Sequence, residues 1–248
     1  MKGWWLPATL AALAWMAPPT ERPVPFRAGE TLTFDVSWSQ FLTAGTATIA
    51  VREKRPSFDS IAYYIVADGQ PTALLSRLYT LYYKADTLLD AFTLLPQRAS
   101  VYSKEGSRDR MKALRFDQNA RRGVYEVKTS TVVTRTLTLP AMTQDPLSAI
   151  YVLRARPLSL GATFTMPVVN NGDIYRMDAK VIANETVVTP VGQLAAWKIV
   201  PTIFDEHGKP SGEKLGLWIS DDARKLPVKL EADLPVGHFV ITLKGVRN

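Results

Sequence analysis

Apolar and polar residues alternate along most of the chain, and the alternation is clearest near its C-terminus. Residues 215–219 and 228–232 each carry apolar side chains at every second position, and the polar residues 220–224 between them are typical of a turn. In the second run Lys229 and Glu231 occupy the alternate positions. Because successive side chains of a β-strand point to opposite faces, this period of two predicts half-buried antiparallel strands.

Similar runs recur over the rest of the chain. The other predicted strands are 31–38, 45–51, 61–67, 79–85, 98–103, 108–116, 123–128, 132–139, 164–169, 174–181, 194–201 and a last strand that begins at His238. Residues 71–78 have near-helical spacing and predict a short helix. Residues 144–156 predict the clearest helix, with Asp145 as N-cap, Pro146 at the first helical position and Pro157 as its stop.

About a dozen strands are more than an open sheet carries without curling. We therefore expect an all-β, mainly antiparallel fold in which a single curved sheet forms a barrel or half-barrel with one or two short helices. Two stacked sheets are the alternative.

The N-terminus is typical of an exported protein. Residues 1–17 predict a secretory signal peptide, because a charged start precedes an uncharged stretch that is too short to span a membrane. Cleavage is expected after Ala14 or Ala17. An uncleaved anchor is the alternative, and the prolines that follow argue against it. We expect residues 18–25 to be a Pro-rich leader without secondary structure and residues 26–248 to be a single β-rich domain, with no transmembrane helix after signal cleavage.

Composition and charge narrow the function. The chain has no cysteine, which excludes a thiol nucleophile and a disulfide framework, and in an exported protein favours a bacterial periplasm or envelope of the Gram-negative type. The net charge is +7, and its excess is concentrated in residues 98–122. A basic patch attracts anionic lipid or envelope polysaccharide, rather than nucleic acid in this setting. The alternative is a solvated outer face of two strands. The basic residues of segment 98–122 are Arg98, Lys104, Arg108, Arg110, Lys112, Arg115, Arg121 and Arg122.

Tyrosines and leucines gather around the predicted helix at 71–78. They either belong to an ordinary core or line an apolar cavity that would suit a lipid-like ligand. The cluster comprises Tyr63, Tyr64, Tyr79, Tyr82, Tyr83, Leu74, Leu75, Leu78 and Leu81. The candidate ligand-binding residues are Tyr79, Tyr82, Tyr83, Arg77, Arg110 and Lys112.

No catalytic pattern stands out. His207 and His238 lack the close spacing of a metal motif, and no serine-nucleophile elbow occurs. Asp221 and Asp222 are adjacent, so their side chains are expected to point to opposite faces. We expect Asp221 to anchor the turn by accepting backbone N–H bonds. The sequence thus predicts a protein that is not an enzyme and uses no cofactor or metal.

Three separated segments resemble the domain-of-unknown-function family numbered 3108. They are FRAGETL at 26–32 with DVSW at 35–38 and AGTA at 44–47, then DPLSA at 145–149, and WISDD at 218–222 with Pro227, Val228 and Gly237. The resemblance implies a β-rich exported protein of Gram-negative-type bacteria and assigns no reaction and no site residues. Comparison with periplasmic lipid carriers is an analogy at the level of the fold.

The favoured hypothesis is a non-enzymatic envelope protein that binds or carries a lipid-like or amphipathic ligand in a curved β-sheet. It predicts a continuous apolar cavity. A structural or protein-interaction module of the envelope is the alternative, and it predicts a solid core with a protein partner. A hydrolase of cell-wall carbohydrate is the least favoured hypothesis.

Overall fold

A computed structural model describes residues 20–39, 42–78, 81–211, 214–234 and 237–247. Within these residues, fourteen strands form one antiparallel sheet and are accompanied by two helices. The first eight strands are β1 (Thr31–Trp38), β2 (Leu42–Ser57), β3 (Ser60–Pro71), β4 (Leu81–Asp90), β5 (Pro96–Glu105), β6 (Arg108–Asp117), β7 (Arg122–Lys128) and β8 (Val132–Thr138). The other six are β9 (Thr163–Asn170), β10 (Asp173–Thr189), β11 (Gly192–Phe204), β12 (Lys214–Ser220), β13 (Pro227–Leu234) and β14 (Gly237–Arg247). The helices are α1 (Ala73–Leu78) and α2 (Pro146–Arg154).

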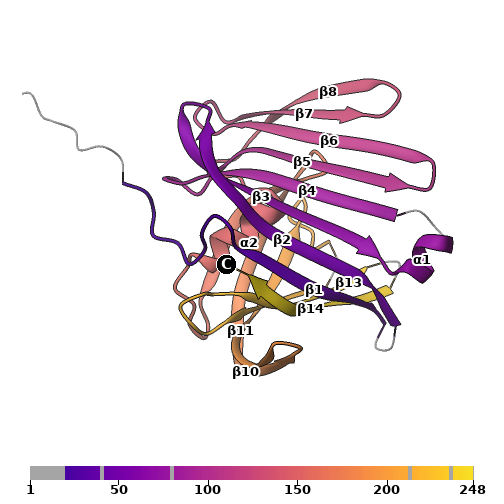
Figure 1. The fold of residues 1–248 in the computed structure, drawn as a ribbon. Helices are drawn as coiled ribbons and strands as arrows, with labels where there is room; N and C mark the ends of the chain where they lie inside the picture. Colours follow the sequence, from indigo (N-terminus) through magenta and orange to yellow (C-terminus); the bar gives the residue numbers. More distant parts are fainter. Residues whose placement is uncertain (1–19, 40–41, 79–80, 212–213, 235–236, 248) are drawn as a thin grey trace, which may run out of the picture.

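The predicted all-β fold with a single curved sheet is confirmed, and the alternative of two stacked sheets is wrong. Strand order runs β8-β7-β6-β5-β4-β3-β2-β1-β14-β13-β12-β11-β10-β9. Strands that follow one another in sequence are therefore paired, except β8 and β9, which form the two edges, and the one pair of strands distant in sequence is β1 with β14. Two meanders therefore join through the first and last strands. The chain passes from the β8 edge to the β9 edge through the segment that contains α2, and the sheet curls around this helix (Figure 1).

Helix α2 begins with the cap that the sequence predicts. The Asp145 carboxylate accepts hydrogen bonds from the backbone N–H groups of Leu147 (2.9 Å) and Ser148 (3.1 Å), and the Ser148 hydroxyl accepts one from the Asp145 N–H. The other carboxylate oxygen accepts a hydrogen bond from the Thr87 hydroxyl of β4 at 2.8 Å. Burial raises the pKa of this carboxyl, although hydrogen bonding with Thr87, Ser148 and Leu147 acts to lower it. The cap therefore also fixes the start of α2 to the sheet.

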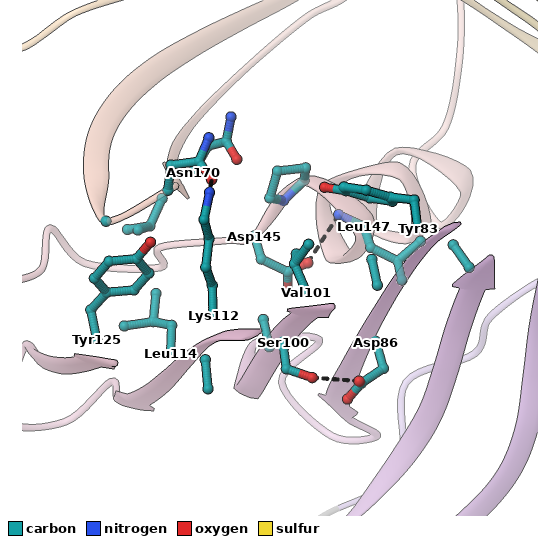
Figure 2. A pocket seen from close by; sticks show the side chains of 18 of the residues that line it. Tyr83, Asp86, Ser100, Val101, Lys112, Leu114, Tyr125, Asp145, Leu147 and Asn170 are labelled. Atoms are coloured by element: carbon teal, nitrogen blue, oxygen red, sulfur yellow. Dashed lines mark hydrogen bonds between the residues drawn. The ribbon is translucent and has the colours of Figure 1, made fainter. Parts of the chain in front are cut away.

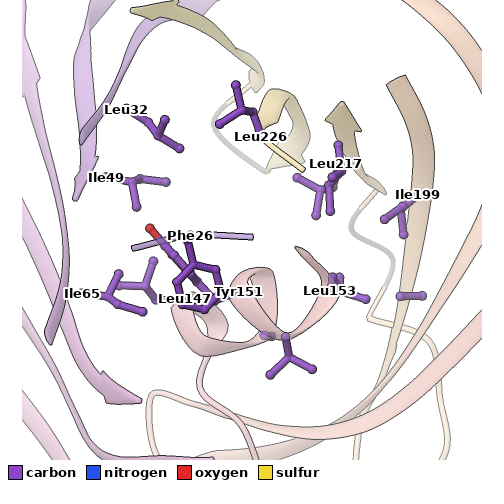
Figure 3. Close-up of a cluster of buried hydrophobic side chains, with 14 of the residues drawn as sticks. Phe26, Leu32, Ile49, Ile65, Leu147, Tyr151, Leu153, Ile199, Leu217 and Leu226 are labelled. Carbon is purple, nitrogen blue, oxygen red and sulfur yellow. The ribbon is translucent and has the colours of Figure 1, made fainter. Parts of the chain in front are cut away.

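The main core lies between α2 and the concave face of the sheet. Leu147, Tyr151 and Leu153 project from the helix, with side chains of the first meander on one side and of the second on the other (Figure 3). Phe26, which precedes β1, packs edge-on against Tyr151 with the ring centroids 4.8 Å apart. One helix thus fills one end of the barrel-like sheet.

An enclosed ion pair ties this packed end together. The Arg154 guanidinium of α2 binds the Glu30 carboxylate through two hydrogen bonds of 2.6 and 2.9 Å, and the two side chains are 0% and 4% exposed. Arg154 also donates to the backbone carbonyl of Lys225 at 2.8 Å. The helix, the start of β1 and the turn between β12 and β13 are therefore held by one side chain.

The N-terminal predictions meet the structure only in part. The predicted signal peptide at 1–17 lies outside the described residues. Residues 20–25 contain no helix or strand, as expected of the leader, and Arg22 fixes them to the β4–β5 turn by donating to the carbonyls of Ala91 and Phe92. Among the described residues, no helix has the length and apolar character needed to cross a membrane.

The two aspartates of the β12–β13 turn have roles other than the one predicted. Asp222, rather than Asp221, accepts the backbone N–H bonds of the turn, from Arg224 and Lys225. The Asp221 carboxylate instead accepts the indole N–H of Trp197 at 2.7 Å. The prediction for Asp221 was wrong because the sequence does not show which of two adjacent carboxylates points back into the turn.

Candidate functional site

The concave face has a hollow at the end opposite the packed ion pair, beside α1. This larger cavity has a volume of about 600 Å³. Its walls are almost wholly apolar and include Val36, Trp38, Leu75, Leu81, Tyr83 and Phe239. The Trp38 and Phe239 rings stack across the β1–β14 pair, 6.5 Å apart with an interplanar angle of 14°.

Small residues leave this space open. Gly45 and Gly69 line the cavity from the paired strands β2 and β3. A Cβ atom added at Gly69 would meet no heavy atom within 4 Å, so the volume above it is empty. At Gly45 a Cβ would lie 2.2 Å from the Gln70 carbonyl oxygen, so that glycine serves close backbone packing instead.

A smaller cavity of about 250 Å³ adjoins the first, and Tyr83 lines both. It lies between β4–β7, the start of α2 and the β9–β10 turn (Figure 2). Its apolar wall includes Ala85, Ala99, Val101 and Leu114. The larger cavity lies beside α1 and the smaller one beside the β9–β10 turn, and we call the two cavities together the hollow.

The smaller cavity has a polar end, formed by Lys112, Tyr125 and Asn171. The Lys112 ammonium donates a hydrogen bond of 2.5 Å to the Asn171 side-chain oxygen. Burial lowers the pKa of Lys112, and the positive charge of Arg110 lowers it further, whereas the Glu105 carboxylate raises it. Burial likewise raises the pKa of the Tyr125 hydroxyl.

The structure brings only some of the candidate ligand-binding residues together. Tyr83 and Lys112 line the hollow. Arg110 is exposed and precedes Lys112 by two positions in β6, which places it on the same face of the strand. Arg77 is exposed on α1, and Tyr79 lies outside the described residues. Tyr82 is not among the lining residues of either cavity.

Tyr82 faces the other side of the sheet, because neighbouring residues of a strand alternate in direction. Its ring lies 6.0 Å from that of Tyr102. The predicted tyrosine cluster is divided for the same reason. Tyr63 is buried in the main core against Phe26, whereas Tyr64 lies under the Arg55 guanidinium. A single aromatic cluster around α1 was therefore the wrong interpretation.

The basic segment 98–122 is also divided between faces. Arg98 and Arg115 line a separate hollow of about 410 Å³ together with the exposed Phe58 and Met111. Lys112 follows Met111 directly in β6 and so points to the opposite face, where it lines the smaller cavity. The basic residues thus do not form one patch, although both faces carry some of the positive charge.

The carboxylates and histidines form no metal-binding cluster in the described part of the chain. No group of three or more His, Cys, Asp or Glu side chains there is arranged to hold a metal ion. His207 lies in the exposed turn after β11, and His238 pairs with Asp233 at 2.5 Å. Both histidines therefore lie at the surface. They belong to strands β11 and β14 or the turn beside them, which are not neighbours of β6 and β7 at the polar end of the smaller cavity.

Sequence reasoning missed several residues that shape the hollow, notably Trp38, Phe239, Gly69 and Tyr125. A signal for them was present. On the concave face, β3 carries Ile65, Ala67 and Gly69 in that order, and the positions of β2 paired with them are Val51, Ile49 and Ala47, followed by Gly45. Side-chain size falls along both strands toward α1, so the sheet alone provides a hollow at that end.

These features define a β-rich protein with a barrel-like sheet and a hollow concave face. The chain belongs to the protein family of unknown function DUF3108, whose model matches residues 33–244. A comparison with curated proteins found no match.

Solved structures share the fold at low sequence identity. A β-barrel-like protein of the domain-of-unknown-function family DUF1849 from Brucella abortus is 11% identical, with a TM-score of 0.54 over 89% of this chain and 98% of that chain. A protein provisionally described as a lipoprotein, from Parabacteroides distasonis, is 8% identical, with a TM-score of 0.39 over 92% of this chain and 100% of that chain. The Brucella structure supports the barrel-like fold and nothing beyond the fold.

Proposed function

We propose that this protein is a non-enzymatic binding protein of the bacterial cell envelope that holds or carries a lipid-like or amphipathic ligand on its concave face. The observation that carries the proposal is the pair of adjoining cavities, of about 600 and 250 Å³, that meet at Tyr83. Small-molecule sites commonly enclose about 300–1,000 Å³ and are walled by apolar and aromatic side chains.

The lining supports an apolar ligand on energetic grounds. Removing apolar surface from water contributes about 25 cal/mol for each Å² buried. Val36, Leu75 and Phe239 offer such surface in the larger cavity, and a hydrocarbon chain would shield both itself and these side chains. The hollow is also built into the strands, so binding needs no large rearrangement of the sheet.

The envelope location is part of this proposal and rests on the sequence. Residues 1–17 have the pattern of a signal peptide, and the chain contains no cysteine. Anionic lipid or an envelope polysaccharide is the expected partner because of the net charge of +7 and the basic residues concentrated at 98–122.

The test combines native purification with a variant that fills the hollow. The protein is purified from envelope extracts without denaturation, and bound lipids are quantified by mass spectrometry. Gly69→Phe should abolish the co-purifying lipid, because its ring would occupy the empty volume above β3. The matched control is Gly245→Phe, since Gly245 lies in β14 outside both cavity linings and its Cβ would make only an ordinary contact at 3.9 Å. Absence of any bound lipid in the unmodified protein, together with no uptake of a fluorescent fatty-acid probe, would overturn the proposal.

A protein-interaction module is the second candidate, and the β8 edge favours it. β8 is the terminal strand of the sheet, and its Val132 and Val133 side chains are 61% and 57% exposed. An exposed edge strand can accept an extended peptide as an additional strand. Covalent cross-linking in envelope extracts, with Val133→Pro as the disrupting variant, tests this candidate.

A further inference from the structure

Lys112 is a cation in the wall of a largely apolar cavity, and its hydrogen bond is with a neutral group. Its ammonium bonds to the Asn171 amide oxygen, and no carboxylate of the described residues lies within ion-pair distance of it. Some other lysines of the described residues are neutralised directly: Lys229 pairs with Glu231, and Lys244 pairs with Asp35. The charge of Lys112 is therefore left for another partner.

Two arginines lie near Lys112, on neighbouring parts of the same face. Arg110 lies two positions before it on the same face of β6. Arg135 of β8 reaches over the Tyr125 ring and donates to the Gly172 carbonyl of the β9–β10 turn at 3.2 Å. Asp173 lies 3.8 Å from Arg135, and Glu105 acts on Lys112 from a distance. Asp86 and Asp145 also line this cavity, but each is held by a hydroxyl of the sheet, of Ser100 and Thr87, and neither pairs with Lys112.

The β9–β10 turn is shaped to fit these side chains closely. Gly172 has φ +83°, and a Cβ atom there would lie 2.4 Å from the Arg135 guanidinium and 2.6 Å from the Tyr125 ring. The turn thus packs directly on the inner face of β7 and β8. It closes the polar end of the smaller cavity and holds the Asn171 side chain against Lys112.

The hollow therefore has two chemically distinct ends. One end has Lys112, Asn171 and Tyr125, which supply hydrogen-bond donors and a positive charge. The other end, beyond Tyr83, is the apolar cavity beside α1. Figure 2 shows Lys112 and Tyr83 on the same side of the sheet, with Lys112 directed toward the β9–β10 turn.

We propose that the ligand is an amphiphile with one anionic head group, a carboxylate or a phosphate, whose head group binds Lys112 and whose chain extends past Tyr83 into the larger cavity. This inference rests on the proposed function and specifies the ligand of the same site. An uncharged amphiphile would leave the Lys112 charge without a counter-ion in a partly desolvated wall. An anionic head group forms charge-assisted hydrogen bonds there, which are roughly twice as strong as neutral ones.

The test measures the affinities of matched probes by displacement of a fluorescent fatty-acid probe. Hexadecanoate and hexadecanoyl lysophosphatidic acid carry the two anionic head groups, and 1-hexadecanol has the same chain length without charge. We expect both anions to bind at least about tenfold more tightly than the alcohol to the unmodified protein, from one charge-assisted hydrogen bond. The ratio of the two anion affinities distinguishes a carboxylate from a phosphate ligand, and either preference supports the proposal.

Variants assign this preference to one residue. Lys112→Met should weaken both anions by about tenfold or more and leave the alcohol within about twofold, whereas Lys112→Arg should retain most of the preference. The matched control is Lys84→Met, because Lys84 is a half-buried lysine of β4 that lines neither cavity. Circular dichroism of each variant confirms that the fold is kept.

Two results separate the failure of this inference from that of the proposed function. Equal affinities for anion and alcohol in the unmodified protein, or an equal loss for both in Lys112→Met, would overturn the head-group assignment while leaving amphiphile binding intact. Binding of no probe, or binding that Gly69→Phe does not weaken, would overturn both.

Discussion

The two ends of strands β2 and β3 face the same concave side of the sheet and differ in how that side is filled. At the end near Glu30 and α2, the inward side chains include Val51 and Ile65, each fully buried in the core. At the end near α1, the inward positions are Gly45 and Gly69, and a cavity of about 600 Å³ lies above them. The same pair of strands thus holds the fold at one end and leaves a hollow at the other.

This difference suggests that one end of the strands stabilises the fold while the other end leaves room for a ligand. Protein interiors are normally close-packed, and unfilled volume forfeits dispersion contacts. A row of small residues that leaves such volume is a departure from the packing that would best stabilise the sheet, and departures of this kind are expected at functional sites. The packed end should therefore dominate stability, and the hollow end should tolerate change.

The largest predicted effect on the free energy of unfolding comes from removing the buried ion pair of the packed end. Arg154→Met should destabilise the protein by about 3–5 kcal/mol, because it leaves the Glu30 carboxylate buried without its partner. Urea unfolding monitored by circular dichroism measures the loss.

Two further variants serve as references for this prediction. Arg55→Met removes the partner of Glu53 at the surface and should cost about 0–1 kcal/mol. The double variant Glu30→Leu with Arg154→Met should recover much of the stability, since apolar side chains can replace a buried ion pair. An Arg154→Met protein as stable as Arg55→Met would contradict the role given to the ion pair.

A pair of identical truncations compares the two ends directly. Val51→Ala, at the packed end, should cost about 2–3 kcal/mol, because two buried carbons are lost and a void remains. Val36→Ala, in the wall of the larger cavity, should cost about 1 kcal/mol or less, since its side chain already borders open volume. Thermal or urea unfolding of both variants tests the comparison, and equal losses would show that the hollow end is as tightly packed as the other.

Much of the fold follows from local sequence patterns. Every predicted strand has a counterpart, because a period of two in apolar positions reports a half-buried strand directly. Asp145 followed by Pro146 correctly marked the start of α2. Asn171 and Gly172, which separate the predicted strands 164–169 and 174–181, form the β9–β10 hairpin turn, and both adopt positive φ there.

The candidate site was less accessible from sequence, for two physical reasons. Tyr82 and Tyr83 are adjacent in one strand, so they could not both line one cavity, and alternation alone would have separated them. The polar end depends on packing between distant segments. Lys112 and Asn171 are 59 positions apart and meet only because the chain crosses the concave face through α2. No local pattern contains that contact.

At the packed end, the Asp90 carboxylate makes a contribution to the stability of the folded state that depends on pH. Burial acts to raise the pKa of Asp90, but hydrogen bonds from Ser60, Thr93 and Phe92 outweigh it and hold that pKa below its usual value. A carboxyl whose pKa is lowered by folding stabilises the folded state above its unfolded pKa of about 3.9. That contribution is lost as the pH falls through the folded pKa.

Asp90→Asn should therefore cost about 1–3 kcal/mol at pH 7, because the amide presents a donor to groups that themselves donate. The difference in free energy of unfolding between Asp90→Asn and the unmodified protein should become smaller below a pH of about 4. Unfolding at a series of pH values measures it, with Glu126→Gln on the exposed outer face as the control. A difference that does not change with pH would mean that the Asp90 charge makes no contribution.

The smallest effect concerns two glycines in strands, of which only one borders the hollow. Gly69→Ala should stabilise the protein by about 0.4–1 kcal/mol, because alanine restricts the unfolded chain and its Cβ would enter open space. Gly216→Ala in β12 makes the same change where a Cβ would lie 2.7 Å from the Trp218 ring, so it should destabilise the protein instead. Opposite signs in calorimetric melting temperatures would show that room for side chains exists at the α1 end and is absent beside Trp218. A loss of stability in both variants would mean that the space above Gly69 is filled by packing in solution, and the comparison between the two ends would then fail.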